Sequence, residues 1–335
     1  MLFILLLFSL ESFLKLSGLG YLSYGERNYK GLFTNYISPF HDYKKTRFIP
    51  PLWISEPNKN FSDNKNEFSY SYTYNSIGLR EKELSDFKNK KTILFLGDSF
   101  TEGAGTPNDS TGIVSVENKL KFKNLNYSCY NGGSSGSDIC FAYRLYTDTL
   151  YALKPEVVVI NLNNTDLYDI YKRGGDERFA GKKIKYSKGP YYEWFYGSSY
   201  IVRTIISGIF KINPEGDYEK DTKGLEKSLN IIYEKIIDFQ ALAKKDNFKL
   251  VVVFTPWLNE LAINKSILDP IMQAIQSENQ IDVIDCRKEI RNLKFITPKN
   301  QYDYYWKIDK HFTSKGYWLW GEIVGEYLIE NKIVK

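Results

Sequence analysis

A serine and a histidine lie in sequence segments that indicate a nucleophile and its general base. Ser99 follows a short apolar run in the segment LFLGDSF, and His311 lies near the C-terminus in DKHFTSKGY. A serine hydroxyl is a poor nucleophile until an adjacent base takes its proton. A neutral imidazole is the base that most often does so. The pair therefore predicts attack on a carbonyl carbon, with Ser99 as the nucleophile and His311 as the general base.

The scarcity of histidine narrows the choice of base. The chain contains two histidines, and the other one, His41, lies in a proline-punctuated lead-in outside the predicted strands and helices. We assign His41 a structural or exposed role. Asp309 stands two residues before His311, and a carboxylate there would hold the imidazole tautomer and stabilise its protonated form.

Four short apolar runs and one more alternating segment, residues 124–131, predict the strands that position these residues. Runs rich in Val, Ile and Leu suit strands that are buried on both faces, as in parallel sheets. The five segments cover residues 92–97, 124–131, 156–162, 248–256 and 280–286. Helical patterns cover 110–121, 137–153, 224–245, 269–276 and 314–330. This alternation predicts an α/β fold with helices on both faces of the sheet. The alternating run FSYSYTY predicts a further short strand before them.

Small and polar residues follow the first three strands. GDSFT follows the first, NGGSSG (131–136) the second and NNTD (163–166) the third. In an open α/β sheet, ligands bind beyond the carboxyl ends of the strands. We therefore expect these loops and the His311 segment to meet at one edge of the sheet.

These segments resemble the sequence blocks of the SGNH/GDSL hydrolase family over roughly residues 75–330. LFLGDSFTEGAG resembles the first block, NGGSSG the second and DKHFTSKGY the last. NSIGLREKEL resembles what precedes the first block in membrane-associated bacterial members. The resemblance implies a flavodoxin-like three-layer α/β/α sandwich with a mainly parallel five-stranded sheet. It also implies that the backbone N–H groups of Ser99 and Gly136 stabilise the oxyanion.

Two positions depart from the family pattern. The family places its Asp three residues before the His, where this chain has Ile308. Asp309 reaches His311 if the backbone is extended there, because residues two apart then share a face. In the third block the family has an Asn that donates to the oxyanion. Alignment on Asp166 puts Thr165 at that position, so the third donor is expected from Thr165, or from Asn164 or Asn163 beside it.

The N-terminal segment predicts attachment to a membrane. Residues 1–24 are apolar apart from Glu11 and Lys15, and a span needs about 20 residues. We expect an anchor or uncleaved signal there, with a cleaved signal or a buried helix as alternatives. We expect the rest of the protein to face the periplasm or exterior of a bacterium. Residues 25–89 form an irregular lead-in, and 90–335 the hydrolase-like domain, with an insertion at about 168–218.

The composition excludes several classes of partner. The net charge is +5, and the lysines are scattered among acidic residues without a basic block, which argues against a nucleic-acid partner. Without a CxxC pair and with two histidines, no metal site is expected, and the chemistry needs no cofactor. Cys129 and Cys140 would pair in an oxidising compartment, but we favour three buried thiols.

The predicted activity is hydrolysis of a carboxylic ester, acyl or acetyl, through an acyl-Ser99 intermediate. By the resemblance, the substrate is an acylated small molecule, a cell-surface carbohydrate or a lipid. Two alternatives stay open. One is an O-acetyltransferase that passes the acyl group to an envelope polysaccharide, and the other is a non-catalytic envelope protein that retains the fold.

Overall fold

The computed structural model describes residues 2–17, 57–80, 82–179, 192, 195–196, 199–212, 221–277 and 281–335. The chain divides into two compact units, with boundaries after residues 45, 169 and 227. The first unit includes α1 and the described residues between 170 and 227. The second unit includes all strands and the candidate site, and each unit is described by itself.

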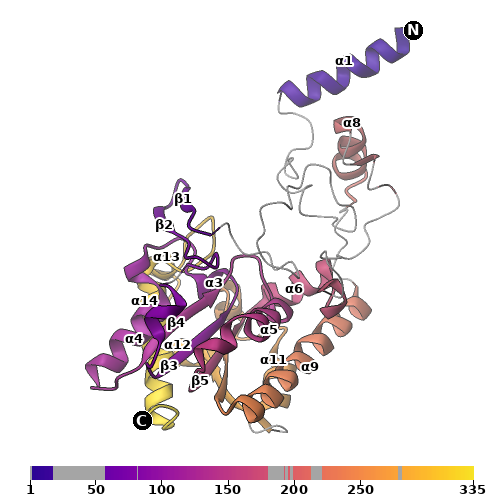
Figure 1. Cartoon of the computed structure of the whole chain (residues 1–335). Coiled ribbons are helices and arrows are strands. Elements are labelled where there is room, and N and C mark those ends of the chain that lie inside the picture. The colour runs from indigo at the N-terminus through magenta and orange to yellow at the C-terminus, as the bar shows by residue number, and fades with distance from the viewer. Residues whose placement is uncertain are drawn as a thin grey trace. The chain divides into compact units, whose positions relative to one another are not determined.

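A five-stranded parallel sheet forms the centre of the second unit (Figure 1). Its strands are β3 (Thr92–Gly97), β4 (Ser128–Gly133), β5 (Val157–Leu162), β6 (Lys249–Phe254) and β7 (Asp282–Asp285). Their order is β4-β3-β5-β6-β7, and every pair is parallel. Counted from β3, this order is 2-1-3-4-5, that of flavodoxin-like folds. The predicted fold class is confirmed.

Burial explains why the apolar runs form these strands. Every residue of β3 and of β5 is buried, as expected for strands covered by helices on both faces. Each of the five observed strands overlaps a predicted one. The largest difference is at β4, which begins at Ser128, four residues after the predicted start, and ends at Gly133.

Helices cover the sheet and connect its strands. The α-helices of the second unit, some of which continue into the first, are α3 (Ser99–Glu102), α4 (Gly112–Phe122), α5 (Ile139–Asp148), α6 (Asn164–Arg173), α9 (Thr222–Asp246), α10 (Leu258–Ile263), α11 (Asp269–Ser277), α12 (Cys286–Leu293), α13 (Gln301–Tyr304) and α14 (Ser314–Glu330). The 3₁₀ segments are η2 (Leu84–Phe87), η3 (Asn108–Ser110), η4 (Leu150–Leu153) and, in the first unit, η5 (Asp176–Phe179).

Two hydrophobic layers hold the helices to the sheet. On one face, Ile93 and Phe95 of β3 pack in a core with α4 and α14. On the other face, α5 and α9 meet through the rings of Tyr146 and Phe239, with centroids 6.3 Å apart. Figure 1 shows these two helix groups on opposite sides of the strands. The sandwich leaves the carboxyl ends of the strands, where Ser99 lies, at one edge.

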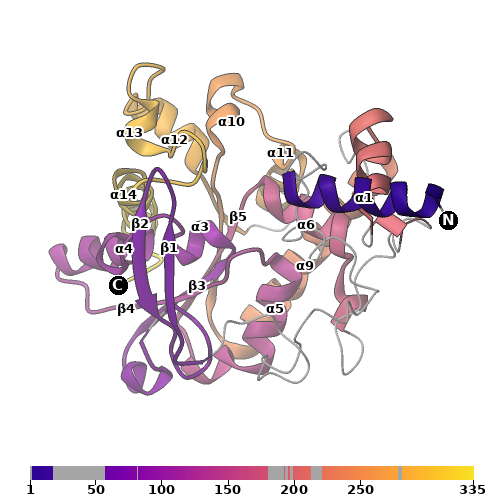
Figure 2. The ribbon, with the colours of Figure 1, turned by 90° about the horizontal axis from the view of Figure 1, so that it is seen from above.

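An antiparallel hairpin precedes the sheet and belongs to the same unit. It consists of β1 (Asn60–Asn64) and β2 (Ser69–Thr73), and β2 lies within the predicted strand FSYSYTY. Its aromatic side chains Phe68, Tyr70, Tyr72 and Tyr74 form a buried cluster against Phe61 and Trp306. Figure 2 shows the hairpin beside α3. Residues 25–56 of the predicted lead-in lie outside the described residues.

The first unit contains α1 (Leu2–Ser17), α8 (Tyr200–Arg203) and the π-helical η6 (Thr204–Ile209). The carboxylate of Glu11 in α1 accepts hydrogen bonds from the backbone N–H of Tyr200 (2.5 Å) and of Ile201 (3.1 Å) at the start of α8. Among the described residues, no helix has the length and apolar character needed to cross a bilayer. Residues 18–24 of the predicted anchor and much of the predicted insertion lie outside the described residues.

Candidate active site

Ser99 is the first residue of the short helix α3, directly beyond the carboxyl end of β3. Asp98 caps this helix, because its Oδ1 accepts the backbone N–H of Phe100 at 3.0 Å. Asp98 is buried, whereas Ser99 is partly exposed. The sharp change from strand to helix therefore presents the hydroxyl of Ser99 to solvent at the edge of the sheet.

His311 and Asp309 form a hydrogen-bonded chain with Ser99. The Oγ atom of Ser99 lies 2.7 Å from Nε2 of His311, and Nδ1 of His311 lies 2.5 Å from Oδ1 of Asp309. The ring of His311 packs on that of Phe100, with centroids 4.9 Å apart. A carboxylate at Nδ1 favours the tautomer in which Nδ1 carries the proton and Nε2 accepts one. The structure thus brings together the three residues that the sequence analysis selected.

The backbone between Asp309 and His311 differs from the expectation. We expected an extended segment, but Asp309 lies in a turn and Lys310 has φ +75°. A closed loop produces this geometry, because the N–H of Trp306 donates to the carbonyl of His311 and the N–H of Lys310 donates to the carbonyl of Trp306. The left-handed residue turns the chain back, so that the Asp309 carboxylate reaches Nδ1 without an extended backbone.

Asp309 is held as a carboxylate. Its side chain is 11% exposed, and Oδ2 accepts a hydrogen bond from Nζ of Lys65 at 2.5 Å. Burial by itself raises the pKa of Asp309, but the hydrogen bonds and charges of His311 and Lys65 outweigh it. The pKa of this carboxyl therefore lies well below its usual value. At neutral pH the group is ionised and serves only as an acceptor.

The NGGSSG loop is tied to the Ser99 segment. The N–H of Ser134 and the hydroxyl of Ser137 both donate to the carbonyl of Gly97, at 3.0 and 3.1 Å. A Cβ on Gly133 would lie 2.2 Å from the backbone nitrogen of Glu102, so only glycine allows this close approach to α3. Gly136 is exposed with φ +73°. These contacts place the loop that carries Gly136 beside the nucleophile helix.

The third loop makes its hydrogen bonds to Asp98 instead. The Oδ2 atom of Asp98 accepts from Nδ2 of Asn163 at 2.9 Å and from the hydroxyl of Thr165 at 2.7 Å. Oδ1 of Asn163 in turn accepts the indole N–H of Trp257 at 3.3 Å. A threonine hydroxyl has a single proton to donate. The single hydroxyl proton of Thr165 and one of the two amide protons of Asn163 are therefore directed at neighbouring side chains, and Asn163 itself is 1% exposed.

Asn164 differs from its two neighbours. It is the first residue of α6 and partly exposed, and within the described part of the chain its side chain makes no hydrogen bond. Of the three candidates for the third donor, Asn164 is the one whose side chain makes none of these hydrogen bonds. Asp166, the fourth residue of this loop, is fully buried, and burial followed by the charge of Asp98 raises its pKa well above the ordinary value.

The hairpin supplies residues that the sequence analysis did not select. The hydroxyl of Tyr72 donates to Oε1 of Glu102 at 2.5 Å, and Oε2 of Glu102 accepts the backbone N–H of Ser135 at 2.6 Å. Burial and the charge of Glu102 raise the pKa of Tyr72 well above its usual value, so Tyr72 remains a donor. Glu102 thus links the hairpin to the NGGSSG loop. The alternating pattern predicted a strand here but gave no indication of its partner.

The lead-in motif NSIGLRE has a structural role at the edge of the site. Arg80 donates from Nη1 to the carbonyl of Gly103 at 2.6 Å and from Nη2 to the carbonyl of Thr106 at 2.5 Å. Its Nε donates to Oδ1 of Asn108 at 2.7 Å. The guanidinium also stacks on the ring of Tyr72. Arg80 therefore fastens the loop that follows the nucleophile helix.

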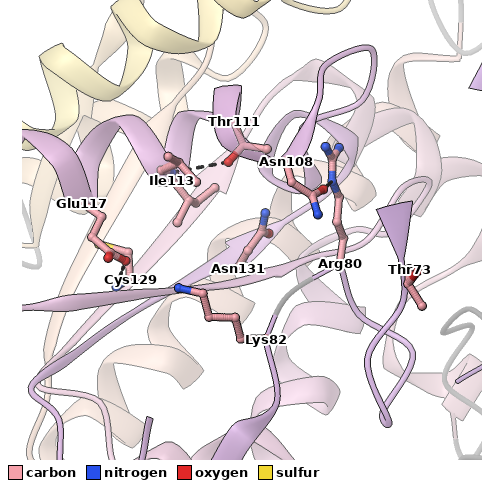
Figure 3. A pocket seen from close by; sticks show the side chains of 10 residues that line it. Thr73, Arg80, Lys82, Asn108, Thr111, Ile113, Glu117, Cys129 and Asn131 are labelled. Carbon is pink, nitrogen blue, oxygen red and sulfur yellow. Dashed lines mark hydrogen bonds between the residues drawn. The ribbon is translucent and has the colours of Figure 1, made fainter. Parts of the chain in front are cut away.

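A cavity of about 250 Å³ lies beside Arg80 (Figure 3). Its lining residues are Thr73, Arg80, Lys82, Asn108, Thr111, Ile113, Val114, Glu117, Cys129 and Asn131. Ser99, Asp309 and His311 are not among them. Most of the N–H donors of Arg80 already bond to backbone carbonyls and to Asn108.

The remaining predictions concern cysteines and His41. Three buried thiols were the favoured prediction, and the structure shows Cys129, Cys140 and Cys286 as buried free cysteines. His41 lies outside the described residues.

Comparison with known proteins finds similarity of fold. No family model matches the chain, and no curated protein matches it. A candidate lipolytic protein of the G-D-S-L family from Desulfitobacterium hafniense DCB-2 is 16% identical, with a TM-score of 0.42 over 71% of this chain and 99% of that chain. The acetylxylan esterase Axe2 from Geobacillus stearothermophilus is 14% identical, with a TM-score of 0.44 over 71% and 94%. The acetyl xylan esterase AlAXEase is 18% identical, with a TM-score of 0.43 over 72% and 98%.

At such identities and TM-scores, no residue's role follows from these proteins. The fold follows from the chain's own sheet, whose strands run in the order 2-1-3-4-5 and are all parallel. Ser99 lies directly beyond the carboxyl end of β3. His311, in the segment before the last helix, is hydrogen-bonded to it there. With this sheet and this placement, the chain has the α/β/α fold that its resemblance to the SGNH/GDSL hydrolases implies.

Proposed function

We propose that the protein is a serine esterase that hydrolyses a carboxylic ester through an acyl-Ser99 intermediate. The observation that carries the proposal is the continuous chain from Ser99 Oγ to His311 Nε2 and from His311 Nδ1 to Asp309, at 2.7 and 2.5 Å. A nucleophile, its base and an orienting carboxylate at these distances are the parts that acyl transfer requires.

The residues of the site divide the tasks of the proposed reaction among them. His311 takes the proton of Ser99 as the hydroxyl attacks the carbonyl carbon, and then gives it to the leaving alcohol. A water molecule, deprotonated by His311, next attacks the acyl-Ser99 ester, and His311 returns the proton to Ser99 Oγ as the acyl–oxygen bond breaks and the acid leaves. The backbone N–H groups of Ser99 and Gly136 stabilise the negative oxygen in both steps. Atoms balance with water alone, and no cofactor takes part.

We propose that acyl or acetyl groups of cell-surface carbohydrate or lipid are the physiological substrates.

The test of the proposed function is an assay of the purified protein on esters of increasing acyl length and on acetylated glycan. Release of free acid, with turnover, supports hydrolysis. Acylated acceptor without free acid would instead identify an acyltransferase. No turnover and no reaction with a fluorophosphonate would identify a non-catalytic protein.

The third oxyanion donor is expected to be Asn164. The Thr165 hydroxyl donates to Asp98, and Asn163 is buried with one amide proton on Asp98, whereas Asn164 is partly exposed and neither of its amide protons is engaged within the described residues. Asn164→Ala is expected to lower kcat by about 10²- to 10³-fold, the effect of removing one oxyanion donor, with KM nearly unchanged. Steady-state kinetics on a soluble ester would measure both constants.

Thr165→Val is the matched control, because it removes a hydroxyl from the same loop. It is expected to lower kcat less than Asn164→Ala does, since it loosens Asp98 without removing an oxyanion donor. The assignment of Asn164 is wrong if Thr165→Val has the larger effect on kcat.

We propose that α1 attaches the protein to a membrane. Five successive residues, Ile4 to Phe8, are all exposed, from 41% at Leu7 to 74% at Phe8. Successive residues of a helix point in directions about 100° apart, so this stretch of α1 is apolar around its circumference. A lipid bilayer can cover such a helix on every side, whereas one protein groove covers one face. The carboxylate of Glu11, which lipid would disfavour, is hydrogen-bonded to α8.

Flotation of the full-length protein with phospholipid vesicles tests this attachment. The wild type is expected to float with the vesicles, and the double variant Leu6→Asp, Phe8→Asp to remain at the bottom of the gradient. Phe122→Asp is the control, because Phe122 is 82% exposed on α4 and lies in the other unit. A wild type that stays at the bottom would refute the proposal.

A further inference from the structure

Asp309 is contacted on both of its carboxylate oxygens. Oδ1 faces Nδ1 of His311, and Oδ2 accepts from Nζ of Lys65, each at 2.5 Å. Lys65 lies 244 positions earlier in the chain, in the turn between β1 and β2. The lysine approaches the carboxylate on the oxygen opposite the histidine. Lys65 thereby limits rotation of the carboxylate about its own axis.

The same turn also holds the backbone of Asp309. The carboxylate of Glu67 accepts the N–H of Ile308 at 2.8 Å and the N–H of Asp309 at 2.9 Å. Two successive N–H groups that share one carboxylate cannot move independently of it. This contact matters because Lys310, the next residue, has the left-handed φ of +75°, a conformation that is unfavourable for a non-glycine residue. Glu67 helps to hold the loop in that conformation.

Aromatic packing anchors the turn to the loop. The ring of Phe68 packs on that of Trp306, with centroids 5.4 Å apart, and Phe68 is 8% exposed. The N–H of Lys65 donates to the carbonyl of Phe68 at 2.8 Å, which closes the turn. The ammonium of Lys65 lies 5.0 Å from the centre of the Phe68 ring. The backbone that carries Lys65 is therefore held in place near Asp309, although the Lys65 side chain itself is 46% exposed.

We propose that Lys65 is a positioning residue of the active site, which orients the Asp309 carboxylate toward His311 and offsets part of its charge, while Glu67 holds the Asp309 backbone. The proposal rests on the proposed esterase function. It makes the hairpin part of the reaction machinery, and the site incomplete without the lead-in segment that carries β1 and β2.

The charges that face Asp309 set the direction of the expected pH effect. They are His311 on Oδ1, Lys65 on Oδ2, Asp63 at 3.5 Å behind Lys65, and Glu67 on the backbone, whereas Lys310 donates to the carbonyl of Lys307. Without Lys65, no ammonium group offsets the negative charge of the Asp309 carboxylate that the imidazole of His311 faces. The protonated, inactive imidazole is then favoured, so activity needs a higher pH.

Lys65→Met, Lys65→Arg and Lys315→Met form the experiment. Lys65→Met is expected to lower kcat about tenfold through misorientation, and to move the acid limb of the kcat/KM profile upward by roughly 0.5–1 pH unit. Lys65→Arg, which keeps the charge, is expected to restore the limb. Lys315→Met removes the same charge from an exposed pair with Asp303 and is expected to match the wild type.

The outcomes separate this proposal from the proposed function. A Lys65→Met profile that coincides with the wild type, in a protein that still reacts with fluorophosphonate, overturns the role of Lys65 and leaves the esterase proposal standing. A shifted limb that Lys65→Arg does not restore overturns it as well, because the loss is then structural. A wild type that neither turns over nor reacts with the probe removes both proposals.

Discussion

Ser99→Ala is expected to abolish ester hydrolysis, with a fall in kcat of about 10⁶-fold, and to abolish reaction with a fluorophosphonate. The size follows from removing the only atom that can form the acyl intermediate in a site whose parts act as a unit. Loss of the nucleophile in such a site costs about as much as loss of all its catalytic residues. The measurement is single-site labelling of the full-length protein, followed by steady-state kinetics on the best ester.

Folding should survive this substitution, which makes the result interpretable. Ser99 is partly exposed, and alanine is compatible with the first position of α3, which Asp98 caps through the N–H of Phe100. The control is Ser135→Ala, which removes an exposed hydroxyl from the adjacent loop. Its labelling is expected to equal that of the wild type. Labelling that persists in Ser99→Ala would mean that another residue is the nucleophile.

The sheet was predictable because each strand carries its own evidence. A largely apolar, β-branched run such as Val157–Leu162 is typical of a strand whose two faces are both removed from water, and all six of its residues are buried. The nucleophile was predictable for a related reason. A serine directly after such a strand must lie at the carboxyl edge of the sheet, where these folds bind ligands.

The parts that escaped prediction depend on contacts between distant segments. Lys65 lies in a polar run that resembles any exposed turn, and its importance comes only from Asp309, 244 residues later. Likewise, Thr165 stood at the position of an oxyanion donor, yet its hydroxyl is drawn to the buried carboxylate of Asp98. Neither preference is visible in sequence spacing, because both are decided by which charged group lies within reach after folding.

The Asp309 loop illustrates a correct residue reached through a wrong geometry. Spacing alone suggested that Asp309 must share an extended face with His311. The loop instead closes on itself through Trp306 and uses a left-handed residue at Lys310. A lysine gives no sequence indication of a positive φ, which usually favours glycine or asparagine.

Asp309→Asn is expected to lower kcat by about 10⁴-fold while leaving the nucleophile in place. An amide can donate to Nδ1 of His311, which favours the tautomer whose Nε2 carries the proton and cannot accept the proton of Ser99. The amide also leaves Lys65 without its carboxylate partner. Asp303→Asn is the control, because Asp303 is 57% exposed on the preceding helix and pairs only with Lys315 among the described ion pairs. Kinetics at the pH optimum measure the difference.

The stability of Asp309→Asn should depend on pH in a defined direction. The folded pKa of Asp309 is lowered, so its ionised form stabilises the fold above the ordinary pKa of an aspartate, and this stabilisation is lost as the pH falls through the lowered value. The difference in unfolding free energy between wild type and variant is therefore expected to be full at pH 7 and smaller below about pH 4. Urea titrations at the two pH values measure it, and a difference that grows on acidification would contradict the ionised assignment.

Moving the carboxylate to the position usual for the family should not restore activity. In the double variant Ile308→Asp, Asp309→Asn, the new carboxylate would replace a side chain that is 73% exposed. The N–H of residue 308 is held by Glu67, so the backbone cannot easily rotate the new group toward His311. We expect kcat to stay within about tenfold of the single variant. Recovery to near the wild-type rate would show that the loop is adaptable, and that its geometry does not require the carboxylate to be at position 309.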